Sequence, residues 1–398
     1  MIFALIAVLG VMITTIQVLL VRRFRNAEHR LPAGIELAKD TAGRMPAERP
    51  AGSRRSAADP CDRPEFISIL KPVCGLDDEL EENLLSFTKL RGMRYEVIVS
   101  AEEWEDPALE VVRKVMRAHP FAPLRIVVDA GTRSGVVNRK VERLVAAARV
   151  ASGDVFFISD SNVRVGPDDL ARTLAAFDDP RVGCVSNLFT GAGARSLGAT
   201  IESLHLLSFV APGAVLAASV NTPCVVGKSM AITRRVHDAI GGFERFRHVL
   251  AEDQAIGVAV REAGYAVALS PVVVRNVVVD RSVSRAVDRQ VRWNKIRYSF
   301  SRALYASELI LNPLPFALAA AFFSPAFALL VVVARWLQVA LLNRSLRAGL
   351  SWKQISAVPL LDAAMFYAWF VPFFSNEVKW RGYRARIGRG TEMLEVAV

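Results

Sequence analysis

The sequence predicts an α/β domain with a mainly parallel sheet, attached to a membrane by apolar segments at both ends of the chain. Between residues 66 and 159, short apolar runs alternate with helical stretches of roughly ten to fifteen residues, which is typical of a parallel sheet with helices on both faces. The chain has 398 residues and is 52% hydrophobic, yet its middle is as charged as a soluble domain. The apolar residues are therefore concentrated at the ends.

The first 21 residues predict a transmembrane anchor. They contain no charged side chain and are long enough to cross a bilayer. Arg22, Arg23 and Arg25 follow this run, whereas a cleaved signal peptide carries its basic residues before the apolar run. We therefore expect an uncleaved anchor with its basic flank in the cytoplasm. Residues 22–64 are rich in Ala, Arg, Pro and Gly without periodicity and are expected to form a flexible linker.

The region after this linker predicts the parallel sheet. Strands are expected at residues 66–70, 95–100, 124–128 and 155–159, and helices from Asp78, Pro107 and Asn138. The carboxyl ends of parallel strands line one edge of a sheet, and ligands bind there. The polar turns at 71–72, 102–107 and 160–162 should therefore converge on one crevice.

Asp160 follows the apolar strand at 155–159, which presents its carboxylate at the carboxyl end of a buried strand. A divalent cation bound there, Mg²⁺ or Mn²⁺, would neutralise charge on a leaving diphosphate. Mg²⁺ needs only one or two protein carboxylates when substrate phosphates supply further oxygens, and Asn162 offers a neutral oxygen. The alternative role for Asp160 is a helix cap or a turn residue.

Three further residues are candidates for binding a nucleotide donor. Glu103 and Asp106 follow the second strand and can accept hydrogen bonds from a nucleobase and from ribose hydroxyls. Asp106 precedes Pro107, so it is equally suited to cap the next helix. Lys140 lies at the start of the following predicted helix and suits a contact with uracil or phosphate, although an isolated lysine more often lies on a solvated surface.

Glu252 and Asp253 open a predicted helix, where the helix dipole favours acidic residues. A transferase that inverts configuration needs a carboxylate to take the proton of the acceptor hydroxyl, and Asp253 is the candidate base. Arg289, Arg292 and Trp293 offer planar cations for phosphates and an indole face for a sugar. The alternative for this stretch is a basic amphipathic helix at the membrane interface.

Two other classes of binding site are excluded. The net charge of +11 comes from arginines that cluster beside the apolar segments and lack the aromatic interleaving of a nucleic-acid groove, so we expect juxtamembrane charge facing anionic lipid and no nucleic-acid partner. Gly227-Lys228-Ser229 resembles part of a phosphate-binding loop, but Thr222 stands where that loop requires glycine.

The C-terminal part predicts a membrane-embedded region at 307–375 and a cytoplasmic tail at 376–398. Residues 309–342 suffice for two short spans, or for one span and an interfacial piece, and 357–374 form another apolar stretch that contains Asp362. Basic residues place both flanks of this last stretch in the cytoplasm, so one segment should be re-entrant or interfacial. An acid within a membrane is a functional candidate by default, although Asp362 could simply face the helix bundle.

Taken together, these motifs resemble the ceramide glucosyltransferases, from Phe66 to the C-terminus. The resemblance is carried by residues 68–72, 105–108, 160–165, 251–253, 289–293, 380–384 and 388–391. It implies an inverting GT-A type catalytic domain at 65–283, followed at 284–306 by an interfacial helix that contains the Arg-x-x-Arg-Trp motif. It also implies a multi-pass enzyme of the inner membrane, with its catalytic domain in the cytoplasm.

The resemblance assigns roles to particular residues. Asp106 and Asp160 would bind the donor and the metal, Asp253 would be the base, and Arg289, Arg292 and Trp293 would form the final motif. The implied reaction is transfer of glucose from UDP-glucose to the primary hydroxyl of ceramide. Glu103 and its neighbour replace a Gln-Asp pair that is common in the family, and Asn162 replaces a small residue.

Two alternatives stay open, and a third is disfavoured by the number of apolar segments. The acceptor could be a hopanoid or diacylglycerol, and the donor UDP-GlcNAc or UDP-galactose, on the same scaffold. A non-catalytic lipid-binding scaffold would use the same domain, although the acidic turns and the Arg-Trp motif are all retained. A polysaccharide synthase with a secretion channel would need more membrane spans than this chain supplies.

Overall fold

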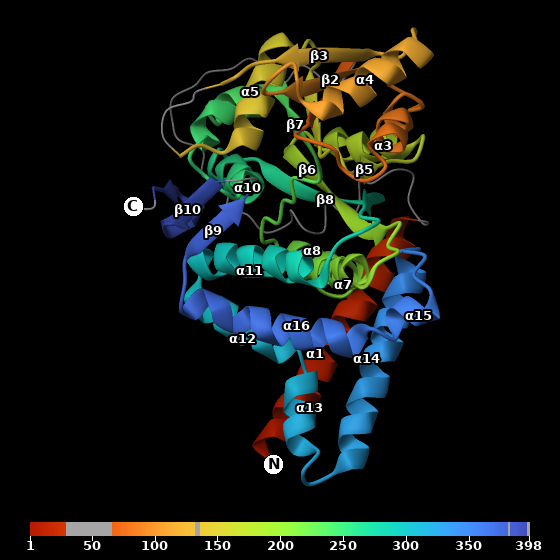
Figure 1. Cartoon of the computed structure of the whole chain (residues 1–398), viewed down its shortest axis with the longest axis vertical. Coiled ribbons are helices and arrows are strands. Elements are labelled where there is room, and N and C mark those ends of the chain that lie inside the picture. The colour runs from red at the N-terminus through yellow and green to blue at the C-terminus, as the bar shows by residue number, and fades with distance from the viewer. Residues whose placement is uncertain (29–65, 132–135, 381–382, 396–398) are drawn as a thin grey trace.

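A computed structural model describes residues 1–28, 66–131, 136–380 and 383–395 (Figure 1). The central sheet has eight strands in the order β3-β2-β1-β4-β7-β6-β8-β5. In chain order these strands are β1 Phe66–Pro72, β2 Arg94–Ala101, β3 Leu124–Val128, β4 Val155–Ser159, β5 Val163–Arg164, β6 Val182–Ala192, β7 Ser229–Thr233 and β8 Ala266–Val277. The first four are parallel, and β6 is parallel to β8, which confirms the predicted mainly parallel α/β fold.

Strand β7 is antiparallel to both of its neighbours, β4 and β6. Ser229, at the start of β7, therefore pairs with Ser159, at the end of β4. The loop that precedes β7 is thereby brought to the carboxyl edge of the parallel strands. This arrangement places Gly227 and Lys228 beside Asp160.

The helices cover both faces of the sheet. Those packed on the sheet are α3 Leu80–Phe87, α4 Pro107–Ala118, α5 Arg139–Val150, α6 Asp169–Leu174, η1 Ala175–Asp178, α9 Arg234–Ala239, η3 Phe243–Phe246 and α10 Glu252–Glu262. Ile69 and Phe157 belong to the core cluster beneath α3 and α4, whereas Leu70 and Ile158 belong to the cluster beneath α5 and α10. Adjacent strand residues thus enter opposite cores, because successive side chains of a strand point to opposite faces.

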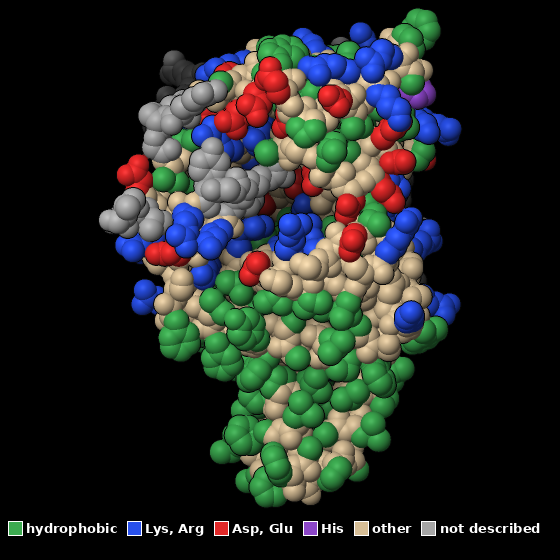
Figure 2. Space-filling model, in the orientation of Figure 1, with side chains coloured by type: hydrophobic (Ala, Val, Ile, Leu, Met, Phe, Trp, Pro, Cys, Tyr) green, Lys and Arg blue, Asp and Glu red, His purple; other side chains and the backbone are tan. Residues whose placement is uncertain are grey.

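A layer of helices lies under the sheet, and an apolar group of helices extends away from it (Figure 1). The layer contains α7 Leu197–His205, the π-helix η2 Leu206–Val210, α8 Ala211–Ser219 and α11 Val283–Phe300, with α12 Arg302–Ser307, η4 Glu308–Leu311, α15 Trp352–Ile355, α16 Val358–Phe370 and η5 Val371–Phe373 beside or beneath them. The extension is built from α1 Ile2–Glu28, α13 Leu314–Ala320 and α14 Pro325–Ser345. Figure 2 shows hydrophobic side chains covering this extension, whereas charged side chains gather above it.

Four helical segments of the described chain are long and apolar enough to cross a membrane: 2–26, 197–219, 325–345 and 352–373. A fifth candidate is the bent pair 302–311 and 314–320, whose two parts meet at 60°. The segment 197–219 is 67% buried beneath the sheet. Helix α16 runs crosswise to α1 and α14 in Figure 1, as expected if it is the interfacial segment predicted from the charges.

Helix α1 continues to Glu28, so the first seven residues of the predicted 22–64 linker are helical. Arg25, in this added part, donates a hydrogen bond to the carbonyl of Pro271 in β8, which ties the helix end to the central sheet. Residues 29–64 of the predicted linker lie outside the described residues.

The C-terminal tail forms a small antiparallel sheet of β9 Glu377–Trp380, β10 Tyr383–Ile387 and β11 Met393–Leu394, with η6 Arg389–Thr391 between the last two strands. Thr391 accepts a hydrogen bond from Leu250 N at its carbonyl (2.9 Å) and one from Ala251 N at its hydroxyl (3.2 Å). The tail therefore fixes the residues that directly precede α10, the helix that begins with Glu252 and Asp253.

Candidate active site

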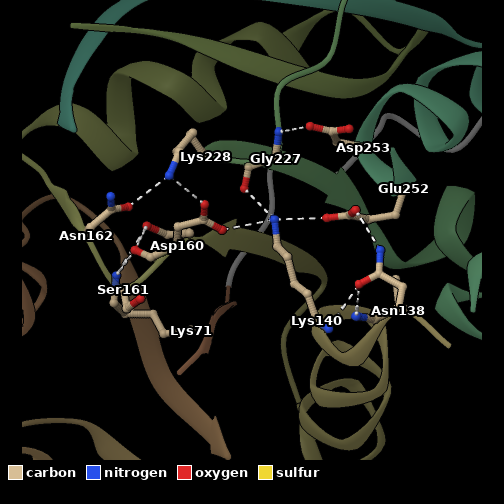
Figure 3. A network of polar contacts seen from close by, with 12 residues as sticks. Lys71, Asn138, Lys140, Asp160, Ser161, Asn162, Gly227, Lys228, Glu252 and Asp253 are labelled. Carbon is tan, nitrogen blue, oxygen red and sulfur yellow. Dashed lines mark hydrogen bonds and ion pairs between the residues drawn. The ribbon is translucent and has the colours of Figure 1, made fainter. Parts of the chain in front are cut away.

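Asp160 lies at the carboxyl end of β4 between Lys140, from the first turn of α5, and Lys228, from the loop before β7 (Figure 3). Lys140 Nζ lies 2.9 Å from Asp160 Oδ1, and Lys228 Nζ lies 3.0 Å from Asp160 Oδ2. Lys71 Nζ donates to the backbone carbonyl of Asp160 at 2.9 Å. Burial alone would raise the pKa of Asp160, but Lys140 and Lys228 hold that pKa well below its usual range, so the carboxylate is ionised.

Lys140 joins this carboxylate to a second one. Its Nζ also lies 2.9 Å from Glu252 Oε1 and donates to the carbonyl of Gly227 at 3.2 Å. Asn138 caps α5 through its side-chain oxygen and donates from Nδ2 to Glu252 Oε2 at 3.0 Å. The start of α5 and the start of α10 are therefore locked together through charge-assisted hydrogen bonds.

Asp253 faces the same loop from α10. Its Oδ2 accepts a hydrogen bond from Gly227 N at 2.6 Å, and its Oδ1 accepts one from Gln254 N at 2.8 Å. A Cβ at position 227 would lie 2.8 Å from Lys140 Nζ and 3.1 Å from Asp253 Cβ. The absence of a side chain at Gly227 thus allows Lys140 and Asp253 to approach one loop from two sides.

The surroundings of Asp253 raise its pKa above that of an ordinary aspartate. Burial raises its pKa, Glu252 raises it further, and Lys140 partly opposes them, so that the pKa lies at about 6. Burial also lowers the pKa of Lys71 to about 7 despite the nearby Asp160. Perturbed pKa values of this kind cluster at functional sites because catalytic groups need them.

The Arg-x-x-Arg-Trp motif lies on α11. Arg289 is buried, stacks 3.9 Å from the centroid of the Trp293 ring, and forms an ion pair with Glu202 at 3.4 Å. Burial lowers the pKa of Arg289, whereas Glu202 and Asp160 raise it, so Asp160 contributes to the field at this guanidinium. Its Nη1 and Nη2 have no hydrogen-bond partner among the described residues. Arg292 is half-buried on the same helix.

Two predicted donor-binding residues lie apart from this network. Asp106 caps α4 by accepting from Ala108 N at 2.9 Å, and its two oxygens also accept from Gly75 N. The capping alternative for Asp106 is therefore what the structure shows. Glu103 is exposed, whereas Glu102 forms ion pairs with Arg139 and Arg143. A donor-binding role for Glu103 and Asp106 stays a prediction.

The oxygen atoms of Asp160 and Asn162 are placed so that both could bind one divalent cation. Lys228 Nζ lies 3.0 Å from both Asp160 Oδ2 and Asn162 Oδ1, so a carboxylate oxygen and an amide oxygen converge on one positive charge. These are oxygen ligands of the kind that Mg²⁺ prefers when phosphates complete its coordination. No group of three or more His, Cys, Asp or Glu side chains in the described parts of the chain would hold a metal alone.

The sequence-based prediction assigns no role to several residues of this network, among them Asn138, Glu202, Gly227 and Lys228. Asn138 and Gly227 act through contacts with segments distant in sequence, which local patterns do not encode. Glu202 carried a usable signal, because it is a single acid within the apolar segment 197–219. The sequence pattern around Lys228 resembles only part of a phosphate-binding loop, which Thr222 excludes.

Comparisons with known proteins bear on the family and the fold. Two curated relatives are Ceramide glucosyltransferase 1 and Ceramide glucosyltransferase 3 of Caenorhabditis elegans. The first is 27% identical over 245 residues, covering 61% of this chain and 52% of the relative. The second is 26% identical over 251 residues, covering 62% and 53%. The chain thus spans about half the length of the curated relatives it matches.

A similar solved structure is that of mannosyltransferase PcManGT from Pyrobaculum calidifontis in complex with GDP-Man and Mn²⁺, with a TM-score of 0.51, 20% identity, and coverage of 94% of this chain and 99% of that chain. This likeness supports a GT-A-like fold. The family model described as Glycosyl transferase family 21 matches residues 3–393. The resemblance predicted from the motifs is therefore confirmed, and the protein belongs to glycosyl transferase family 21, a family of sugar-transferring enzymes.

Proposed function

We propose that the protein transfers glucose from UDP-glucose to the primary hydroxyl of ceramide, with inversion at the sugar carbon. The observation that carries this proposal is the juxtaposition of Asp160, flanked by Lys140 and Lys228, with the basic carboxylate of Asp253 across the Gly227 loop (Figure 3). A cation-rich position for a diphosphate and a base for a hydroxyl are the two elements that such a transfer needs.

The diphosphate position is supported by its positive groups. Lys140 and Lys228 are held at Asp160, and Arg289 presents two guanidinium nitrogens without a hydrogen-bond partner among the described residues. Arginine binds phosphate oxygens through paired N–H groups. These three cations would stabilise the negative charge that develops on the diphosphate as it leaves the sugar.

Asp253 would act as the base. In the proposed step the acceptor oxygen bonds to the anomeric carbon, the bond from that carbon to the diphosphate breaks, and the hydroxyl proton passes to Asp253. A pKa of about 6 leaves most of this carboxylate ionised at neutral pH, yet makes it a stronger base than an ordinary aspartate. The hydrogen bonds from Gly227 N and Gln254 N would hold it in place.

A divalent cation, Mg²⁺ or Mn²⁺, would be held by Asp160 and Asn162 together with the donor's phosphates. It would supply charge neutralisation at the diphosphate when bound. Lys228 now lies at these two oxygens, so we expect its ammonium group to move away from them when the metal binds.

A lipid acceptor is supported by the apolar helices and by the relatives from Caenorhabditis elegans, which are named ceramide glucosyltransferases. We infer a multi-pass protein of the inner membrane with its catalytic domain in the cytoplasm. If α16 lies along the membrane surface, the basic segments on both of its sides stay on one side of the bilayer, as the positive-inside rule requires.

An assay of detergent-purified protein with Mg²⁺ or Mn²⁺ tests the proposal. UDP-glucose, UDP-galactose and UDP-GlcNAc are each offered with ceramide, diacylglycerol or a hopanoid polyol, and glycolipids are followed by mass spectrometry. We expect hexosylceramide from UDP-glucose. If only another lipid is glycosylated, that lipid and not ceramide is the acceptor. If no mixture gives a product, the result favours a non-catalytic lipid-binding scaffold.

A further inference from the structure

A cavity lies where the helix layer under the sheet meets the apolar extension. It measures about 560 Å³, including its open mouth. Its walls come from α1, α11, α14, α16, η4 and the segment around η2. None of the residues assigned above to diphosphate binding or to base catalysis lines it.

Three side chains that line this cavity carry polar atoms with no hydrogen-bond partner among the described residues. These buried, unpaired atoms are both ring nitrogens of His205, Nδ2 of Asn294 and Oδ1 of Asn312. The exposed fraction of His205 is 0% and that of Asn294 is 1%. Buried polar groups are paired in most proteins because leaving them unpaired is costly. A ligand with both donors and acceptors would satisfy all three.

The charged groups of the same cavity are already neutralised. Arg297 forms an ion pair with Glu308 at 2.8 Å, and Arg335 forms one with Asp362 at 3.1 Å. The groups left without partners therefore belong to an imidazole and to amides. They fit an uncharged group with hydroxyl and amide functions better than a phosphate.

The rest of the lining favours a lipid. Leu309, Leu361, Met365 and Trp369 line the cavity from η4 and α16, and α1 and α14 continue from it into the apolar extension. The π-helix η2 begins directly after His205. Turns of this kind are rare, and they occur frequently at functional sites.

The cavity adjoins the motif on α11. The centroid of the His205 ring lies 6.0 Å from the centroid of the Trp293 ring. The guanidinium carbon of Arg289 lies 3.9 Å from the same Trp293 centroid. Asn294 follows Trp293 directly, and Arg297 lies one turn later. Trp293 thus connects the cavity to the cations proposed to bind the diphosphate.

We propose that this cavity binds the polar head of the acceptor, an uncharged lipid headgroup with hydroxyl and amide functions, through His205, Asn294 and Asn312. The inference rests on the proposed function as a lipid glycosyltransferase and adds the place and the chemistry of acceptor recognition. The hydrocarbon chains would leave the cavity along the apolar helices.

The substitution His205→Leu tests the role of the imidazole in full-length protein. Because neither ring nitrogen has a partner in the structure, the change should leave the Tm unaltered or raised. We expect the KM for ceramide to rise about tenfold, the loss of roughly one good hydrogen bond, with the KM for UDP-glucose unchanged. Ser203→Ala is the matched control, because it removes another buried unpartnered polar atom of α7 that does not line the cavity.

A diazirine-bearing ceramide tests binding without catalysis. We expect cross-links to peptides of α11 or α16 that are suppressed by excess ceramide but not by phosphatidic acid, and weaker cross-linking in His205→Leu. Equal suppression by phosphatidic acid, or an unchanged ceramide KM in His205→Leu while the wild type transfers sugar, would overturn this inference alone. Absence of transfer by the wild type would instead reject the proposed function, and cross-linking would still decide whether the cavity binds the lipid.

Discussion

The ammonium group of Lys140 lies 2.9 Å from the carboxylate of Asp160 and joins the first turn of α5 to the end of β4. The same group lies 2.9 Å from Glu252, so a single cation connects three segments that are distant in sequence. Burial would lower the pKa of Lys140, but Asp160, Glu252 and Asp253 raise it well above its usual value, and the ammonium stays charged. Lys140 therefore supplies the positive charge that neutralises both Asp160 and Glu252.

Lys140→Met should weaken UDP binding by about tenfold or more and lower stability. Removing one partner of a buried ion pair lowers the free energy of unfolding by about 3–5 kcal/mol. Because the Asp160 side chain is 23% exposed, we expect a loss at or below the low end of that range. Isothermal titration with UDP and thermal unfolding measure the two effects. Lys140→Arg, which keeps the charge, should retain most of both; UDP binding in Lys140→Met equal to that of the wild type would remove Lys140 from the donor site.

The rate of transfer should depend on pH through Asp253. The base acts only when deprotonated, and its pKa lies at about 6. We expect kcat/KM to be level above this pH and to fall about tenfold for each pH unit below it. Initial rates between pH 5 and pH 8 provide the measurement, and an acid limb near the ordinary aspartate value of about 4 would contradict the assignment.

Glu252→Gln provides the control for this pH profile. Glu252 raises the pKa of Asp253, so removal of its charge should shift the acid limb to lower pH. The neutral amide can still accept from Asn138, which contacts Glu252 at 3.0 Å. An acid limb that stays in place would show that a group other than Asp253 titrates.

Lys228→Met should strengthen metal binding. Lys228 lies 3.0 Å from both Asp160 and Asn162, the residues proposed to hold the cation. Without the competing ammonium group, the Kd for Mn²⁺ should fall several-fold when UDP is saturating for each variant, since a difference of about 1.4 kcal/mol corresponds to a factor of ten. Electron paramagnetic resonance of free Mn²⁺ measures it directly. Weaker Mn²⁺ binding in Lys228→Met would place the metal elsewhere.

Asp362 has a structural explanation. It pairs with Arg335 at 3.1 and 3.3 Å, and this buried pair links α16 to α14. We expect Arg335→Met or Asp362→Leu alone to reduce stability by about 3–5 kcal/mol, because each leaves an uncompensated buried charge, while the double variant recovers much of the loss. Thermal unfolding in detergent tests this; equal losses in the single and double variants would argue against the pairing.

The parallel half of the sheet could be predicted from the sequence because buried strands, caps and helix lengths are local signals. The apolar run 155–159 became β4 without change, and the helix predicted to start at about Asn138 is α5, which begins at Arg139. The antiparallel strand β7 could not be predicted, since its direction depends on pairing with β4 and β6. That strand places Lys228 beside Asp160.

Only those parts of the candidate site that depend on local signals could be predicted. Asp160, Asp253 and Arg289 stand at the ends or on the faces of predictable elements, so their positions followed from topology. The contacts among Lys140, Glu252 and Gly227 depend on the meeting of α5, α10 and the loop before β7. No spacing along the chain encodes such a meeting.

The most direct test of the central claim compares the wild type with Asp253→Asn in a single assay of labelled glucose transfer from UDP-glucose to ceramide, with UDP-glucose binding measured on the same samples. We expect transfer to fall by about 10²–10⁴-fold, because the base is lost, while donor binding remains within about twofold of the wild type. Transfer that persists in Asp253→Asn, or donor binding that is lost together with it, would contradict the assignment of Asp253 as the base.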